Sequence, residues 1–152
     1  MRHYLLFILF FSFTNLGAQS VSNDSILPPV KKDLSEEELQ MAVDSYLQMT
    51  KSETYKQFKK NLRENSIKLK GLDYPPDLKT SDKESIEKWL INNIEKTKYS
   101  SVKEGVEMIH KSYLLMQKLY KENTEVYTFM RRATKEQLRE IIAPERNTFY
   151  DY

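Results

Sequence analysis

The stretch that decides the fold is residues 102–130, VKEGVEMIHKSYLLMQKLYKENTEVYTFM. Apolar and aromatic side chains recur in it at alternating spacings of four and three residues, with Asn123 at one position of the series: Val102, Val106, Ile109, Tyr113, Met116, Tyr120, Tyr127 and Met130. A heptad pattern of this kind is typical of a helix that packs one face against other helices. The sequence therefore predicts a long helix here, which Glu122-Asn123-Thr124 can interrupt with Asn123 acting as a cap.

Helix start signals continue on both sides of this stretch. A Ser or Thr is followed three residues later by Glu or Gln at five places, namely Ser35/Glu38, Thr50/Glu53, Ser81/Glu84, Ser101/Glu104 and Thr134/Gln137. In such a box the hydroxyl accepts a hydrogen bond from one unpaired amide at the helix start and the acidic or amide side chain accepts from another. Together with the absence of strand-like alternation, the boxes predict an all-α domain over residues 34–143, a bundle of four or five helices.

The helix boundaries are predicted from the direction of the apolar stripes and from the helix-breaking residues. Successive residues of a helix are about 100° apart, and on this scale the apolar stripe of residues 35–50 points about 100° away from that of residues 51–70. Two helices or one kinked helix are therefore expected. Gly71 suits a left-handed cap after the second, a third helix spans residues 82–98, and Pro144 ends a last helix over 134–142. The expected core consists of Leu39, Val43, Leu47, Phe58, Leu62, Trp89, Leu90, Ile94, Val106, Ile109, Tyr113, Met116, Tyr120, Tyr127, Leu138 and Ile141.

The first residues have the pattern of an export signal. Arg2 gives a positive start, residues 4–13 are almost continuously apolar, and Gly17-Ala18 ends in small residues. This is typical of a secretory signal peptide over residues 1–18, whereas a membrane anchor needs about 20 apolar residues. We therefore expect a periplasmic or secreted protein with a flexible leader over 19–33 and a C-terminal tail over 144–152.

Composition excludes several function classes. The chain has no cysteine, so disulfides, thiolate metal sites and Cys nucleophiles are absent. Its 24 Lys and Arg nearly balance 22 Asp and Glu, which gives no field for binding nucleic acid. Behind the expected signal, His110 is the sole histidine and no glycine-rich loop is present. We therefore expect no catalytic residues and no enzyme activity.

Tyrosines form the first candidate site. Tyr113, Tyr120 and Tyr127 lie seven residues apart on the long helix, with Met116 and Met130 beside them. The residues are either core side chains whose hydroxyls reach the rim, or an interaction face that receives a partner. The sequence leaves both open, and we take this face as the candidate recognition surface.

A second candidate is a basic surface on the helix over residues 51–70, formed by Lys56, Lys59, Lys60 and Arg63. One interpretation is an amphipathic helix that binds anionic lipid, as on an envelope surface, a glycan or an acidic partner. The other is that this helix lies antiparallel to the acidic helix before it, so that the two neutralise each other.

Metal and cofactor sites have little support. Glu107 and His110 have the spacing of a di-iron ligand pair, but such a site needs a second pair that the sequence lacks. We expect no metal and no cofactor; haem held by His110 and a methionine is an alternative. The expected function is a non-catalytic protein-interaction module, such as an adaptor, inhibitor or immunity-type binder, with a protein partner and at most peripheral membrane contact. The alternatives are a small-ligand carrier, for haem or an apolar molecule, and an envelope-surface binder.

Overall fold

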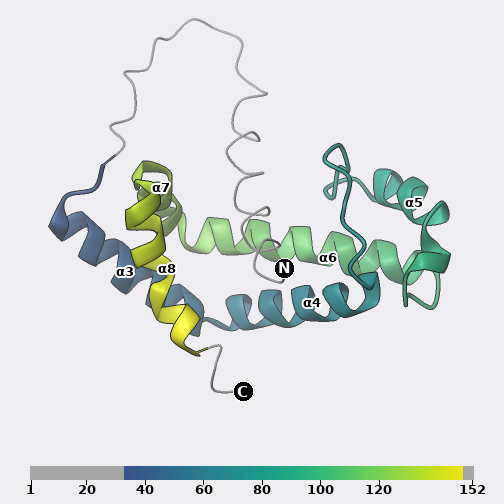
Figure 1. Cartoon of the computed structure of the whole chain (residues 1–152), viewed down its shortest axis with the longest axis horizontal. Helices are drawn as coiled ribbons and strands as arrows, with labels where there is room; N and C mark the ends of the chain where they lie inside the picture. Colours follow the sequence, from purple (N-terminus) through teal and green to yellow (C-terminus); the bar gives the residue numbers. More distant parts are fainter. Residues whose placement is uncertain (1–32, 149–152) are drawn as a thin grey trace, which may run out of the picture.

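The computed structural model describes residues 33–148 (Figure 1). The expected signal peptide, the leader up to residue 32 and residues 149–152 of the tail lie outside them. The described residues form an all-α fold with a single 3-10 turn, Ile94–Lys96, and no strand. The α-helices are α3 (Glu36–Lys51), α4 (Glu53–Leu69), α5 (Lys83–Ile91), α6 (Val102–Glu122), α7 (Thr124–Arg132) and α8 (Lys135–Thr148).

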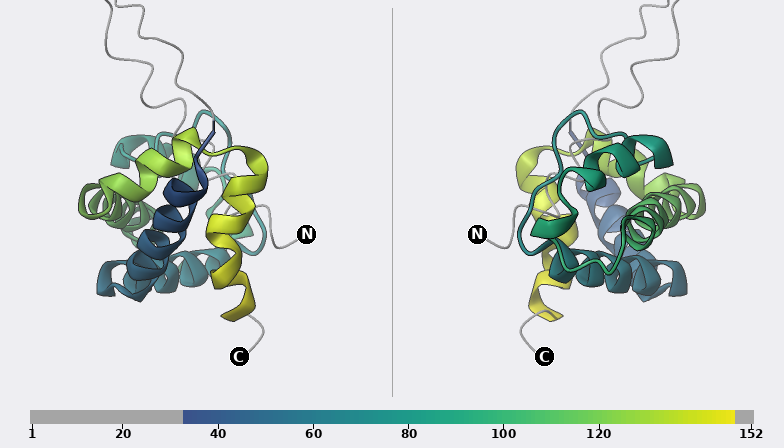
Figure 2. Two further views of the ribbon diagram at one scale, coloured as in Figure 1. Left: turned by 90° about the vertical axis from the view of Figure 1, so that its left-hand side faces the viewer. Right: turned by 90° about the vertical axis from the view of Figure 1, so that its right-hand side faces the viewer.

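Six α-helices replace the expected four or five because the long helix divides at Asn123. The amide Nδ2 of Asn123 donates to the carbonyl of Leu119 at 3.0 Å, which closes the end of α6. An Asn side chain that competes for backbone partners in this way favours a helix end over a helix interior. Figure 2 shows α7 running across the end of α6, and both helices contribute to one core, α6 through Leu115 and Leu119 and α7 through Val126 and Phe129.

The expected break between residues 35–50 and 51–70 is confirmed. Ser52 adopts an extended conformation, with ψ of 149°, and its hydroxyl accepts from the amide of Tyr55. Ser52 therefore caps α4 in place of Thr50, whose hydroxyl donates to the carbonyl of Leu47. In Figure 1 helices α3 and α4 run end to end at an angle, so the expectation of an antiparallel pair was wrong.

Two other boundaries differ from expectation. Helix α5 stops at Ile91 instead of residue 98, because the side chains of Asn92 and Asn93 donate back to the carbonyls of Lys88 and Trp89. Helix α8 continues through Pro144, which was expected to end it. The lost bond would have reached the carbonyl of Glu140, and that residue is exposed, so water can take the place of the missing donor.

Two clusters of buried side chains hold the helices together. The first core joins α3, α7 and α8 to the adjoining halves of α4 and α6, with Tyr46, Met49 and Leu119 at its centre. The second core joins α5 and Tyr99 to the other halves of α4 and α6, around Ile86 and Leu90. Helices α4 and α6 therefore run through the whole elongated molecule and carry both cores (Figure 1).

The expected core residues are all buried or half-buried, but the face of the long helix that was expected to be buried is partly wrong. Phe58, Leu90, Val106, Ile109 and Ile141 are buried. The remaining expected core residues, Trp89 among them, are half-buried, while four leucine, valine and phenylalanine side chains beside the expected seam are buried in their place: Leu115, Leu119, Val126 and Phe129. A straight helix drifts by about 20° per heptad from a strict seven-residue repeat, so a face continuous in sequence does not keep facing one neighbour.

Candidate functional site: a groove between α4 and α6

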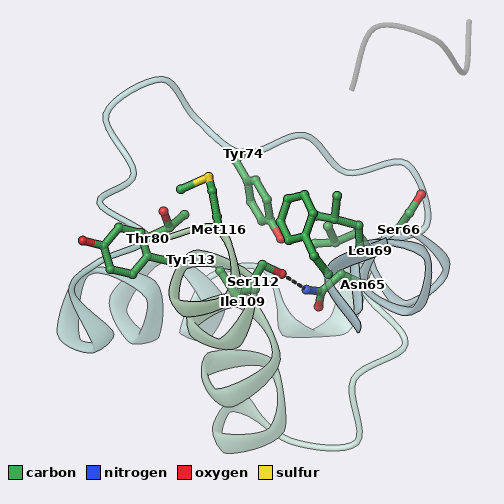
Figure 3. A pocket seen from close by; sticks show the side chains of 11 residues that line it. Asn65, Ser66, Leu69, Tyr74, Thr80, Ile109, Ser112, Tyr113 and Met116 are labelled. Atoms are coloured by element: carbon green, nitrogen blue, oxygen red, sulfur yellow. Dashed lines mark hydrogen bonds between the residues drawn. The ribbon is translucent and has the colours of Figure 1, made fainter. Parts of the chain in front are cut away.

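The candidate site lies where α4 and α6 pair between the two cores. An apolar cavity of about 30 Å³ opens there, lined by Phe58, Leu62, Asn65, Ser66, Leu69, Tyr74, Thr80, Ile109, Ser112, Tyr113 and Met116. In Figure 3 Tyr113 and Met116 rise from α6 opposite Asn65 and Leu69 from α4, with Tyr74 of the loop after α4 between them. This volume has room for a water molecule or a methyl-sized group, and it is too small for haem.

The loop over residues 72–82 closes one end of this groove. Gly71 has φ of +82°, as expected for a left-handed helix end, and Lys70 before it is also left-handed at +54°. The loop is fixed at its far end by Thr80, whose carbonyl lies 3.2 Å from Nδ1 of His110. Tyr74 packs edge-on against Trp89 with ring centroids 5.4 Å apart. Figure 1 shows this loop and α8 at opposite ends of the α4/α6 pair.

A chain of hydrogen bonds forms the polar floor of the groove. Asn65 Nδ2 donates to Ser112 Oγ at 2.8 Å and to the carbonyl of Met108 at 3.0 Å. Ser112 Oγ donates to Asn61 Oδ1 at 2.5 Å, and the hydroxyl of Tyr99 donates to Asn65 Oδ1 at 2.8 Å. Asn61 and Asn65 are each 3% exposed, and no buried polar side-chain atom of the described residues lacks a partner. The network is fully satisfied, which makes it a fixed structural element.

Burial perturbs the tyrosines at this floor. Loss of hydration raises the pKa of Tyr99 to about 12, and the neighbouring Glu104 charge adds to the rise, while the hydrogen bond with Tyr74 opposes it. Burial also raises the pKa of Tyr74 well above its usual range. Both hydroxyls therefore stay protonated and act as hydrogen-bond donors, so neither is prepared to serve as a base.

The sequence contains a signal for this network, in the two asparagines of α4, but none of the candidate sites predicted from the sequence includes it. Asn61 and Asn65 share a stripe of α4 with Phe58 and Leu69, at spacings of three and four residues. Two amides on an otherwise apolar stripe indicate a buried polar contact between helices, because an unpaired buried amide is costly.

The structure divides the expected recognition residues among three places. Tyr113 and Met116 line the groove. Met116, Tyr127 and Met130 pack against the first core, and burial raises the pKa of Tyr127 to about 12. Tyr120 bridges the interruption at Asn123, with its ring 5.2 Å from that of Tyr127. All five are half-buried, so they form a rim around the core that is neither closed nor fully open.

The basic residues lie together on one side of α4. Lys59 and Arg63 lie on the helical stripe of Ser66, which borders the groove, at spacings of four and three residues. Lys56 and Lys60 are their neighbours, each three residues before one of them, and Lys60 lies farther from the groove, beside Glu64. The acidic residues of α3 were expected to neutralise the basic residues of α4. Glu38 of α3 instead binds Arg132 of α7 through two hydrogen bonds of 2.7 and 3.0 Å.

His110 lies outside the groove, at the edge of its own helix. Its ring stacks on Tyr113 with centroids 5.9 Å apart, and it borders an open hollow of about 350 Å³ with Lys83, Glu107 and Lys111. Glu107 pairs with Lys83 at 2.8 Å, which lowers the pKa of that carboxyl. Over residues 33–148 no three His, Asp or Glu side chains gather as a metal site would need.

In the described part of the chain, no helix has the length and apolar character to cross a bilayer. Comparisons with protein-family models, curated proteins and solved structures find no match for this chain. Function therefore has to be argued from the groove and its surroundings.

Proposed function

We propose that this protein is an exported, non-catalytic protein-interaction module, and that the groove between α4 and α6 receives its partner. Export rests on the signal-like residues 1–18, which precede the helical domain. The observation that carries the binding role is the position of Tyr113 and Met116 at an apolar cavity between two helices.

The composition of this rim suits a protein partner. Tyr and Met are enriched where proteins bind one another, because they offer large, adaptable apolar contacts with little hydration to lose. The half-buried rim is pre-formed, since Tyr127 and Met130 pack on the first core and the polar floor below is satisfied. A partner can therefore bury the rim without refolding it.

The two alternatives have less support. A carrier would need an enclosed space, and the cavity of about 30 Å³ suits one inserted side-chain group instead. An envelope-surface binder would use Lys56, Lys59, Lys60 and Arg63, which are neighbours on one side of α4, but the apolar cavity beside them has no role in that function.

The experiment that tests the proposal compares two substitutions one residue apart. Tagged wild-type protein, Tyr113→Ala and Leu114→Ala would each be used to recover partners from solubilised envelope of the native host, with identification by mass spectrometry. Leu114 is the matched control because its side chain is 54% exposed and lines the hollow beside His110 instead of the groove. We expect one protein near stoichiometry with wild type and Leu114→Ala, and its loss with Tyr113→Ala. Equal recovery by both variants, or no specific protein with wild type, would contradict the proposed function.

A further inference from the structure

The charges beside the groove are unevenly placed. The stripe of α4 that borders it carries Lys59, Arg63, Ser66 and Lys70 and no carboxylate, since successive members are four, three and four residues apart. The two carboxylates of α4, Glu53 and Glu64, belong to the next stripe with Gln57 and Lys60, about 120° around the helix. The groove therefore has a basic edge along α4.

These cations are held at the edge in different ways. Arg63 is exposed, and so are Lys56 and Lys70. Lys59 is half-buried, with its Nζ 5.9 Å from the centroid of the Tyr55 ring, so its position is partly fixed. The acidic side chains of the loop, Asp73 and Asp77, lie next to Tyr74 at the other end of the groove. Lys59 and Arg63 therefore lie along the part of α4 that precedes this loop.

The opposite edge of the groove is aromatic. Tyr113 and Tyr120 lie two turns apart on α6, and Met116 lies between them. The glutamates of α6 pair with lysines: Glu104 binds Lys68, Glu107 binds Lys83, and Glu122 lies 3.7 Å from Lys118. Apolar and aromatic contacts on one side and cations on the other are complementary to a helix with an apolar stripe and an acidic flank.

We propose that the partner segment is an acidic amphipathic helix that lies along the groove, inserts an apolar side chain at the cavity, and places its carboxylates against Lys59 and Arg63. This inference rests on the proposed function and names the chemistry of its partner. An anionic membrane matches the same charges less well, because the apolar cavity lies recessed between α4 and α6 and a flat bilayer does not enter it, whereas a projecting side chain does.

The test uses two designed peptides and one vesicle type with the purified full chain. The peptides are labelled 18-residue helices with the same leucine stripe, one with Glu and one with Lys at the remaining positions, read by fluorescence anisotropy. We expect the Glu peptide to bind at least about tenfold more tightly than the Lys peptide at low salt, with the difference shrinking as salt rises.

Matched substitutions assign the site. Arg63→Glu and Lys88→Glu change the net charge equally at exposed positions, the first beside the groove on α4 and the second on α5, which contributes no residue to the groove. We expect Arg63→Glu to weaken the Glu peptide about fivefold or more, and Lys88→Glu to change its affinity less than about twofold. Ser66→Trp, at the exposed border of the cavity, fills the groove without altering charge and should abolish binding.

The outcomes separate this inference from the proposed function. Equal affinity for both peptides, each lost in Ser66→Trp, would keep the docking groove and overturn the acidic partner. Absence of binding by the Glu peptide up to about 1 mM would also overturn the inference, because a dissociation constant above that value corresponds to a binding free energy weaker than about 4 kcal/mol. The full chain would also be sedimented with phosphatidylglycerol vesicles. If it binds them, if Arg63→Glu abolishes that binding, and if the Glu peptide does not compete with it, the basic edge would be assigned to a membrane instead.

Discussion

The hydroxyl of Tyr99 donates a 2.8 Å hydrogen bond to Oδ1 of Asn65, joining the segment before α6 to the middle of α4. Tyr99 is 6% exposed and belongs to the second core, while Asn65 also binds Ser112 on α6. One amide therefore ties α4 to α6 and to the segment directly before α6, at the floor of the groove.

Tyr99→Phe should reveal the contribution of this bond. The phenyl ring keeps the packing, but Asn65 Oδ1 is left buried without its donor, which typically costs about 1–3 kcal/mol of unfolding free energy. Tyr120→Phe, on the half-buried rim, should cost less than about 0.5 kcal/mol. Urea unfolding followed by circular dichroism measures both, and equal effects of the two substitutions would argue against the network.

The starts of α3, α6 and α8 were predictable because their signals are local, whereas α4 and α5 are capped by Ser52 and Asp82 instead of Thr50 and Ser81. The Ser35/Glu38 and Thr134/Gln137 boxes form as expected, each with the backbone and side-chain bonds in place. Ser101 also caps α6, by accepting from the amide of Glu104. These contacts join residues three apart, so a sequence window of one helical turn contains both partners.

The groove was only half predictable, because it depends on how two helices meet. The heptad pattern identified Tyr113 and Met116 as special but could not decide their burial. That depends on the drift of α6 relative to α4 and on the loop that carries Tyr74. Asn61 and Ser112 are 51 residues apart, so their contact has no local signal.

Alkaline titration should separate the tyrosines into two groups. Burial raises the pKa of Tyr99 and of Tyr127 to about 12, whereas ordinary tyrosines ionise near 10. Because the folded pKa is raised, these groups contribute stability that is present below about pH 10 and is lost as the pH rises toward 12. Ultraviolet absorbance should show a late phase that is smaller in Tyr127→Phe. A single phase near pH 10 with the helices intact would contradict the burial of both residues.

Trp89 should matter less for stability than its size suggests. It is half-buried and packs edge-on against Tyr74, whereas its neighbour Leu90 is 0% exposed. We expect Leu90→Ala to cost about 3–5 kcal/mol and Trp89→Ala about 1–3 kcal/mol. Denaturant unfolding of the two variants tests the order, and a larger loss in Trp89→Ala would place Trp89 in the core, as the sequence pattern indicated.

Acid should weaken the contact between α4 and the start of α6. The pKa of Glu104 is lowered to about 2 from 4.5, first by the hydrogen bond from Lys68 and then by those from the backbone and hydroxyl of Ser100. A lowered folded pKa means stability that is present above pH 4.5 and lost as the pH falls toward 2. Glu104→Gln should be less stable than wild type at pH 7, and the difference should narrow across that window. Lys68→Met should show the same narrowing, and a constant difference in both variants would contradict the pairing.

The close approach of α5 to α6 depends on Gly105. A Cβ built at this position would lie 2.6 Å from Leu90 Cδ1 and 3.1 Å from Tyr99 Cδ2, both in the second core. Overpacking of this kind costs about 1–3 kcal/mol, against about 1 kcal/mol gained because Ala favours helix over Gly. We therefore expect Gly105→Ala to destabilise by about 1 kcal/mol in the wild-type background.

A double-mutant cycle distinguishes the steric cause from any other. In a Leu90→Ala background the 2.6 Å contact is removed, and the vacated space lets a small shift relieve the 3.1 Å approach to Tyr99 Cδ2, so Gly105→Ala should become stabilising by about 0.5–1 kcal/mol through helix propensity. Gly71→Ala serves as the opposite control, because no atom lies within 4 Å of its Cβ position and its cost arises from the left-handed backbone at φ +82°. The effect of Gly71→Ala should therefore be the same in both backgrounds. If the effect of Gly105→Ala also failed to change sign, the α5/α6 contact would not be set by Leu90.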